Sequence, residues 1–168
     1  MKSYSSFFTS ICLATALSLS ACGDSSTSTS DSAKSTEQTS ADGVRTIRVT
    51  GNDQLQFNVK EIRAKAGEKL KIEFKNIGRM PKQTMSHNWV LLKKMDDSEV
   101  HAFGMAASTK QPDYLPDDRS AILYHTKLLG PGETDVITIT APDEPGNYPF
   151  LCTFPGHFAM MKGHLIVQ

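Results

Sequence analysis

Hydrophobic and polar residues alternate with a period of two along most of the chain after Val44. Successive side chains of a strand point to opposite faces, so this alternation predicts half-buried β-strands. Turn-forming residues separate the runs, at Gly51-Asn52-Asp53 and at Ala66-Gly67-Glu68. The apolar positions of the first three runs are Ile47 and Val49; Leu55, Phe57 and Val59; and Leu70, Ile72 and Phe74.

The rest of the chain adds five predicted strands and one segment of a different kind. The strands cover residues 88–92, 121–128, 134–140, 147–151 and 164–167. Residues 96–118 lack the alternation, contain Pro112 and Pro116, and include a short predicted helix at residues 99–105. Many short strands separated by turns predict an all-β fold, and we expect a β-sandwich or barrel with Greek-key connections.

The first 21 residues have the pattern of an export signal. Lys2 gives a positive start, residues 7–19 form a short apolar core, and Leu19-Ser20-Ala21-Cys22 resembles the lipobox of bacterial lipoproteins. We expect cleavage before Cys22 and lipidation of Cys22, which anchors the mature chain to a membrane. An ordinary cleaved signal and a retained anchor are the alternatives, although the apolar run is shorter than the ~20 residues of a membrane span. All three interpretations predict export.

Residues 22–43 separate this signal from the alternating region. Eleven of the twenty-one residues from 23 to 43 are Ser or Thr, and the only aliphatic side chains among them are alanines. Such a segment buries too little apolar area to offset its conformational entropy, so we expect a flexible tether that leads to a folded domain of residues 44–168. Glycosylation of this spacer, or its cleavage by proteases, are alternative interpretations.

Composition and charge exclude some classes of function. The 168 residues, 39% of them hydrophobic, suffice for one compact domain. Eighteen Lys and Arg balance eighteen Asp and Glu. Because nucleic-acid binding draws on the neutralisation of phosphates, a neutral chain without a basic stripe is not expected to bind nucleic acid.

Cysteine usage points to a metal. Cys12 lies in the signal and Cys22 is the lipidation site, so Cys152 is alone in the predicted domain. The segment that follows it places His157 and Met161 within ten residues of the thiol, on a loop bent by Pro155 and Gly156. A thiolate, two imidazoles and a weak thioether form the ligand set of a blue copper site, and His87 can supply the second imidazole.

Other interpretations of these residues remain open. Cys152 alone could be a buried inert thiol, or could pair with Cys22 if that residue is not lipidated. Zinc also binds Cys and His, but a closed zinc site needs four strong ligands, and methionine is a weak one. A catalytic Cys-His pair would leave His87 and Met161 without a role.

Residues 46–167 resemble the azurins of the cupredoxin family. The motifs that carry the resemblance are Gly51 to Asn58 (GNDQLQFN), His87 to Leu91 (HNWVL), His125 to Leu128 (HTKL), Cys152 to His157 (CTFPGH) and Met161 to Gly163 (MKG). The resemblance implies an eight-stranded Greek-key β-sandwich with a small helical flap. Arg45 and Glu68 stand where the azurin disulfide would fall, so that bond is not expected here. The lipobox and tether are similar to those of membrane-attached relatives such as the auracyanins.

The resemblance also implies roles for individual residues. His87, Cys152 and His157 correspond to the equatorial copper ligands, Met161 to the weak axial ligand, and the carbonyl of Ser86 to the opposite axial contact. Met160 is the alternative thioether, but the spacing from His157 matches Met161. Asn88 and the amide of Phe154 are expected to brace the ligand loops and to hydrogen-bond the sulfur of Cys152. The apolar patch expected around His157, for docking of redox partners, comprises Leu55, Met85, Met105, Phe154 and Met160.

The function that this resemblance implies is one-electron transfer by one copper ion, cycling between Cu(I) and Cu(II), among exported or membrane-associated redox proteins. We expect a monomer without enzymatic activity, attached to the membrane on the periplasmic side. A copper-binding or copper-buffering protein would use the same ligands and is the main alternative. A catalytic oxidoreductase would need a second ligand cluster, which the sequence does not offer.

Overall fold

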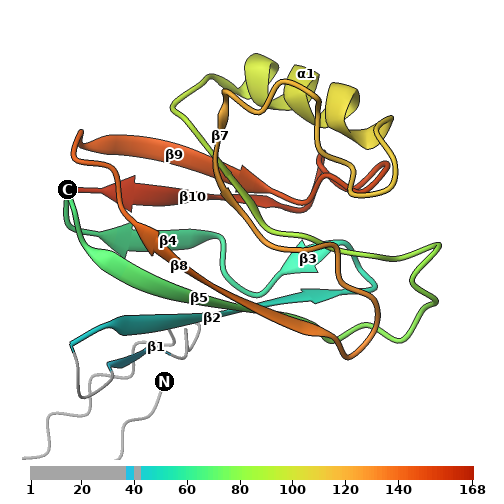
Figure 1. The fold of residues 1–168 in the computed structure, drawn as a ribbon, viewed down its shortest axis with the longest axis horizontal. Coiled ribbons are helices and arrows are strands. Elements are labelled where there is room, and N and C mark those ends of the chain that lie inside the picture. The colour runs from blue at the N-terminus through green and yellow to red at the C-terminus, as the bar shows by residue number, and fades with distance from the viewer. Residues whose placement is uncertain (1–36, 40–42) are drawn as a thin grey trace, which may run out of the picture. The chain divides into compact units, whose positions relative to one another are not determined.

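The computed structural model describes residues 37–39 and 43–168, which form two β-sheets and one helix (Figure 1). The predicted signal, Cys22 and most of the predicted tether lie outside the described residues. The first sheet has the order β1 (Glu37–Thr39), β2 (Arg45–Asn52), β5 (Lys69–Asn76) and β8 (Thr134–Thr140), with β3 (Gln56–Phe57) also paired to β2. The second sheet has the order β4 (Glu61–Ala64), β10 (Lys162–Val167), β9 (Gly146–Leu151), β6 (Val90–Leu92) and β7 (Ile122–His125).

The order of the strands confirms the predicted β-sandwich. Connections β4 to β5, β5 to β6, β7 to β8 and β8 to β9 each pass from one sheet to the other, as Greek-key connections do. The pairs β2–β5 and β4–β10 are parallel, and the other strand pairs are antiparallel. Without the three-residue β1 and the two-residue β3, the described strands are the eight of the expected sandwich.

The main core lies between the two sheets, where the predicted alternation places it. In β5, Leu70, Ile72 and Phe74 are fully buried, whereas the residues between them face outward. The Phe57 ring joins the two sheets, since it packs edge-on against Phe74 at 5.9 Å and against Phe150 at 5.7 Å between ring centroids. This burial of apolar side chains is the main favourable contribution to the stability of the sandwich.

A second apolar cluster lies on the outer face of the second sheet, beneath helix α1 (Asp97–Ser108). Val100 of the helix packs with Val90, Leu92 and Leu151 of the sheet. Asp96 caps the helix and Glu99 completes the capping box, so the helix begins two residues earlier than predicted and ends three residues later. No helix in the described part of the chain has the length and apolar character of a membrane span.

Four strands differ from the sequence-based expectation. β4 was not predicted, and β3 covers only two residues of the run from Leu55 to Val59. β1 lies inside the predicted tether and pairs antiparallel with β2, so the prediction that none of residues 23–43 folds is wrong for residues 37–39. The four-residue β7 is half the length of the predicted strand at 121–128.

Arg45 and Glu68, which stand where the disulfide of azurins would fall, form an ion pair. Nε of Arg45, at the start of β2, lies 2.9 Å from Oε1 of Glu68, in the turn before β5. The other carboxylate oxygen of Glu68 accepts a hydrogen bond from the Lys65 amide at 2.8 Å. The contact with Arg45 lowers the Glu68 pKa against the opposing effect of burial. Cys152 is the free cysteine of the described residues, and it is buried.

Candidate metal centre

Three metal-binding side chains converge at one end of the sandwich. Sγ of Cys152 lies 3.8 Å from Nδ1 of His87 and 3.6 Å from Nδ1 of His157, and the two Nδ1 atoms are 3.2 Å apart. His87 and Cys152 are fully buried, and His157 is 4% exposed. In the described part of the chain, the donor atoms of these three residues lie close enough together to bind one metal ion.

The spacing of the three donor atoms fits a small transition-metal ion. The point equidistant from them lies about 2.1 Å from each, which matches metal–nitrogen bonds of roughly 2.0–2.1 Å. One soft thiolate with two imidazoles is a donor set that suits copper.

Backbone hydrogen bonds hold His87, in the loop between β5 and β6, against the loop between β7 and β8. Its amide donates to the Leu129 carbonyl at 3.0 Å, and the Leu129 amide donates back to the His87 carbonyl at 2.8 Å. Gly51 of β2 lies directly behind the ring, because a Cβ at this position would stand 3.1 Å from Cδ2 of His87 and 2.7 Å from Cε of Met161. A side chain at position 51 would therefore displace two of the predicted ligands.

The loop between β9 and β10 carries the other donors. Gly156 adopts a φ of 81°, which allows the turn that directs His157 back toward Cys152. The Met161 amide donates to the His157 carbonyl at 2.8 Å, and the Cys152 amide donates to the Met161 carbonyl at 2.9 Å. These backbone bonds fix the relative positions of residues 152, 157 and 161 before any ion binds.

Burial keeps both imidazoles in the neutral form that binds metals. Burial lowers the pKa of His87 to about 4, against the opposing effects of the Asn52 carbonyl and the Asp53 carboxylate. Burial, followed by the charge of His87, lowers the pKa of His157 to about 4. Both rings are therefore uncharged near neutral pH, and each offers its Nδ1 lone pair in the tautomer that carries the proton on Nε2.

The thiol of Cys152 is protonated when no cation is present. Burial raises its pKa to about 12, although hydrogen bonds from the backbone amides of Asn88 and Phe154 favour the thiolate. A bound cation must therefore displace one proton from the sulfur, and the two amides then stabilise the negative charge.

Asn88 hydrogen-bonds across the segments that carry His87 and Cys152. Its Nδ2 donates to Oγ1 of Thr153 at 2.8 Å, and the Thr153 amide donates to its Oδ1 at 2.8 Å. All of these groups are fully buried. The pair therefore connects the residue after His87 with the residue after Cys152. Thr153 was not singled out from the sequence, although its place beside the cysteine was a signal.

The two candidate thioethers have opposite environments. Met161 is fully buried and its methyl group lies beside Gly51 and near the His87 ring, whereas Met160 is 59% exposed. Ser86, whose carbonyl was predicted as the opposite axial contact, is buried, and its hydroxyl donates to the Lys82 carbonyl.

The predicted apolar patch is partly present at the surface. Met105 and Met160 are 54% and 59% exposed, and Leu55 and Met85 are half-buried. Phe154 is buried instead, because its ring packs between Tyr114 at 5.1 Å and His157 at 4.8 Å. Trp89 lies in the core beside Phe150, with 5.3 Å between the ring centroids.

A β-sandwich with a buried pair of histidines and one cysteine at its end defines a mononuclear copper protein of the cupredoxin class. A family model described as copper binding proteins, plastocyanin/azurin family, matches residues 44–168. The azurin of Pseudomonas aeruginosa is 41% identical over 125 residues, which are 73% of this chain and 84% of that protein. The chain therefore belongs to the plastocyanin/azurin family, and its cofactor is one copper ion.

Two solved structures agree with this placement. Auracyanin A, titled a "blue" copper protein from Chloroflexus aurantiacus, superposes with a TM-score of 0.68 at 34% identity, over 75% of this chain and 100% of that one. Dithionite-reduced auracyanin from Roseiflexus castenholzii gives a TM-score of 0.65 at 38% identity, over 73% of this chain and 96% of that one.

Proposed function

We propose that this protein is a blue copper electron carrier that moves single electrons between exported or membrane-associated redox proteins. The observation that carries the proposal is the buried triangle of Cys152, His87 and His157, with donor atoms 3.2 to 3.8 Å apart. Bound copper supplies one-electron chemistry between its Cu(I) and Cu(II) states.

Met161 completes the ligand set in this proposal, and the Ser86 carbonyl provides the opposite axial contact. Full burial and the position of its methyl group near His87 favour Met161, while the exposure of Met160 disfavours that residue. The weak axial thioether tunes the reduction potential of such a site.

The residues around the ligands keep their positions fixed during electron transfer. The Asn88–Thr153 pair and the backbone bonds within residues 152–161 hold both loops, and full burial excludes water from three of the four ligands. A fixed set of donors limits the rearrangement that a change of oxidation state requires, which suits a carrier.

Electrons pass through His157 in this proposal, because it is the most exposed of the four ligands. The exposed side chains of Met105 and Met160 belong to the predicted docking patch, with Leu55 and Met85 at its margin. An apolar patch suits the brief encounters that turnover needs.

The lipobox at Cys22 and the following Ser/Thr-rich segment support attachment of the mature chain to the outer side of a cytoplasmic membrane or to another periplasmic surface. Two acyl signals give stable anchoring where one chain gives only marginal binding. We propose a monomeric carrier on such an anchor.

Electron self-exchange of the copper-loaded chain tests the proposal. We expect rapid exchange and a reversible one-electron wave, and we expect Met160→Lys to slow the exchange about tenfold with an unchanged absorption spectrum, because like charges then meet at the encounter surface. Val136→Lys is the matched control, since Val136 is 46% exposed on the first sheet. Slow exchange, together with ready release of copper to a competing chelator, would identify a copper-buffering protein instead.

A further inference from the structure

The outer face of the first sheet is lined with lysines. In β5, the side chains that alternate with buried Leu70, Ile72 and Phe74 are Lys69, Lys71, Glu73 and Lys75. Arg48 of β2 stands opposite Glu73 in the strand register. We call Arg48, Lys69, Lys71 and Lys75 the basic face.

The three lysines of this face carry its unmatched positive charge among the residues that the structure describes. Lys69, Lys71 and Lys75 are exposed, and they form no ion pair with any residue that the structure describes. Glu73 lies 3.7 Å from Arg48, but both side chains are more than a third exposed, so this pair contributes little binding energy and leaves the lysines unmatched. Residues 44–75 carry eight Lys and Arg against four Asp and Glu, whereas residues 76–168 carry eight against ten.

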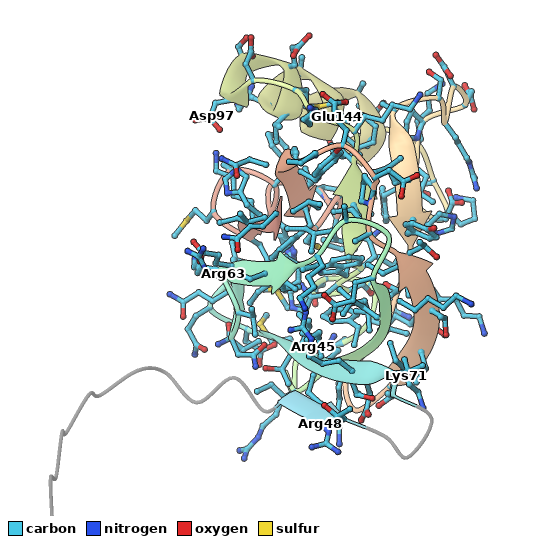
Figure 2. The ribbon with its side chains drawn as sticks, turned by 90° about the vertical axis from the view of Figure 1, so that its left-hand side faces the viewer. Arg45, Arg48, Arg63, Lys71, Asp97 and Glu144 are labelled. Carbon is cyan, nitrogen blue, oxygen red and sulfur yellow. The ribbon has the colours of Figure 1, made fainter. Side chains whose placement is uncertain are left out.

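A group of acidic residues lies on the opposite side of the domain. Helix α1 covers the outer face of the second sheet and begins with Asp96, Asp97 and Glu99. Figure 2 shows the separation: Arg48 and Lys71 lie low in the view, on the first sheet, whereas Asp97 and Glu144 lie at the top. The basic face therefore lies on one side of the domain, whereas the acidic side also carries Lys94 and Lys162, which pair with Glu144 and Asp97.

An electron-transfer partner is a poor occupant for this face. The copper ligands lie at the loop end of the sandwich, and the core side chains of β2 and β5 separate the outer face from the second sheet. A partner that exchanges electrons is expected at His157 instead. The face consequently suits an extended, negatively charged surface that takes no part in electron transfer.

We infer that the basic face binds an anionic lipid bilayer. Its charge complements phospholipid headgroups, and its residues lie side by side on the neighbouring strands β2 and β5. Residues 22–43 lead from the predicted lipid anchor to Gly43, two residues before β2, the strand that carries Arg48. The inference rests on the proposed membrane attachment for the presence of a bilayer, but not on the electron-carrier function.

Binding in this orientation leaves the copper end free at the side of the domain. Each lysine near an anionic membrane strengthens the binding about fivefold, and salt screens the attraction. The acidic start of α1 offers no comparable attraction for an anionic surface, so the basic face sets the orientation. His157 and its patch then remain accessible to partners beside the membrane.

Vesicle binding by the mature, copper-loaded chain with Cys22→Ser tests the inference without an acyl chain. We expect sedimentation with phosphatidylcholine vesicles that contain phosphatidylglycerol, loss of binding at high salt, and no binding to pure phosphatidylcholine. The Lys69→Gln/Lys71→Gln variant should bind about tenfold or more weakly. Lys93→Gln/Lys127→Gln removes the same charge from exposed positions after β6 and β7 and should change binding less than twofold.

Acetylation of lysines on the vesicles provides a positional readout. Lys69, Lys71 and Lys75 should be protected by anionic vesicles, and Lys93 and Lys127 should not. Equal weakening by the two variants, uniform protection, or no binding to anionic vesicles would each overturn the inference. The absorption spectrum and self-exchange of both variants report on the electron-carrier proposal separately, since neither variant touches the copper end.

Discussion

Met160 and Met161 are neighbours in the sequence, but their side chains face solvent and the metal site, respectively. We predict that Met161→Gln lowers the reduction potential of the copper protein, because a harder oxygen donor stabilises Cu(II) relative to Cu(I). Met160→Gln is the matched control and should leave the potential nearly unchanged. Voltammetry of both variants decides the matter, and an equal shift for the two would contradict the assignment of Met161.

The two buried histidines predict how the apo-protein responds to acid. The pKa of each is about 4 in the folded chain, compared with about 6.5 when unfolded, so the unfolded chain binds more protons between these values. The free energy of unfolding should therefore fall as the pH drops from 6.5 to 4, by roughly 2–3 kcal/mol for each histidine. Above pH 6.5 this contribution is complete and constant.

Urea unfolding of the apo-protein across this range measures the effect. The double variant His87→Gln/His157→Gln provides the control, since it retains the titration of all carboxylates. The difference in slope between the two proteins should be confined to pH 4–6.5. Parallel pH profiles would show that the histidines are not held neutral by burial.

Residues with distinctive chemistry could be identified from the sequence, and ordinary ones could not. A lone exported cysteine followed by His157 and Met161 narrows the chemistry to a soft metal, and His87 stands at the start of an apolar run. Gly51 looked like a turn residue only, because the need for a missing side chain arises from the approach of Met161 and His87 in three dimensions. Phe154 was expected at the surface patch, but Tyr114 covers it from a distant segment.

At the scale of elements, α1 packs against the loop that carries His157. Gly104 contacts Phe158, the residue after His157, so closely that a Cβ would lie 2.4 Å from Cγ of Phe158. His101 of the same helix packs edge-on against this ring at 5.2 Å between ring centroids. The helix thus presses on the loop that carries the most exposed ligand.

We predict that Gly104→Ala destabilises the folded protein by about 1–3 kcal/mol and speeds the loss of copper, because either the helix or the loop must shift. Alanine favours helix formation over glycine by up to about 1 kcal/mol, so a net loss of stability would report the clash rather than helix propensity. Met105→Ala, on the exposed neighbour, is the control. Thermal unfolding and transfer of copper to a chelator measure both effects, and a Gly104→Ala protein as stable as the parent would refute the contact.

Strands with a strong alternation of apolar positions could be predicted from the sequence. Strands that form mainly through hydrogen bonding to a neighbouring strand could not. β5 and β8 follow the expected ranges closely because each alternates over seven or more residues. β4 offers only Ile62 and Ala64 to the core and is a strand through its parallel pairing with β10. β1 contains no hydrophobic residue and is ordered by pairing with β2, which no local pattern reveals.

At the scale of the whole molecule, charge and chemistry occupy different sides of one sandwich. The copper ligands lie at the loop end, the lysines on the outer face of the first sheet, and acidic residues at the start of the helix that covers the second sheet. The sequence predicted the sandwich and its metal, because alternation and a ligand motif are local. It could not predict the charge separation, since a net charge of zero conceals how Lys and Asp are distributed over a fold.

The absorption spectrum of the Cu(II)-loaded chain, recorded beside Cys152→Ser, tests the central claim most directly. A thiolate bound to Cu(II) between two imidazoles should give an intense blue absorption that ascorbate removes and that the serine variant lacks. A pale or colourless chain that nevertheless binds one copper ion would contradict the blue copper assignment, and the electron-carrier function with it.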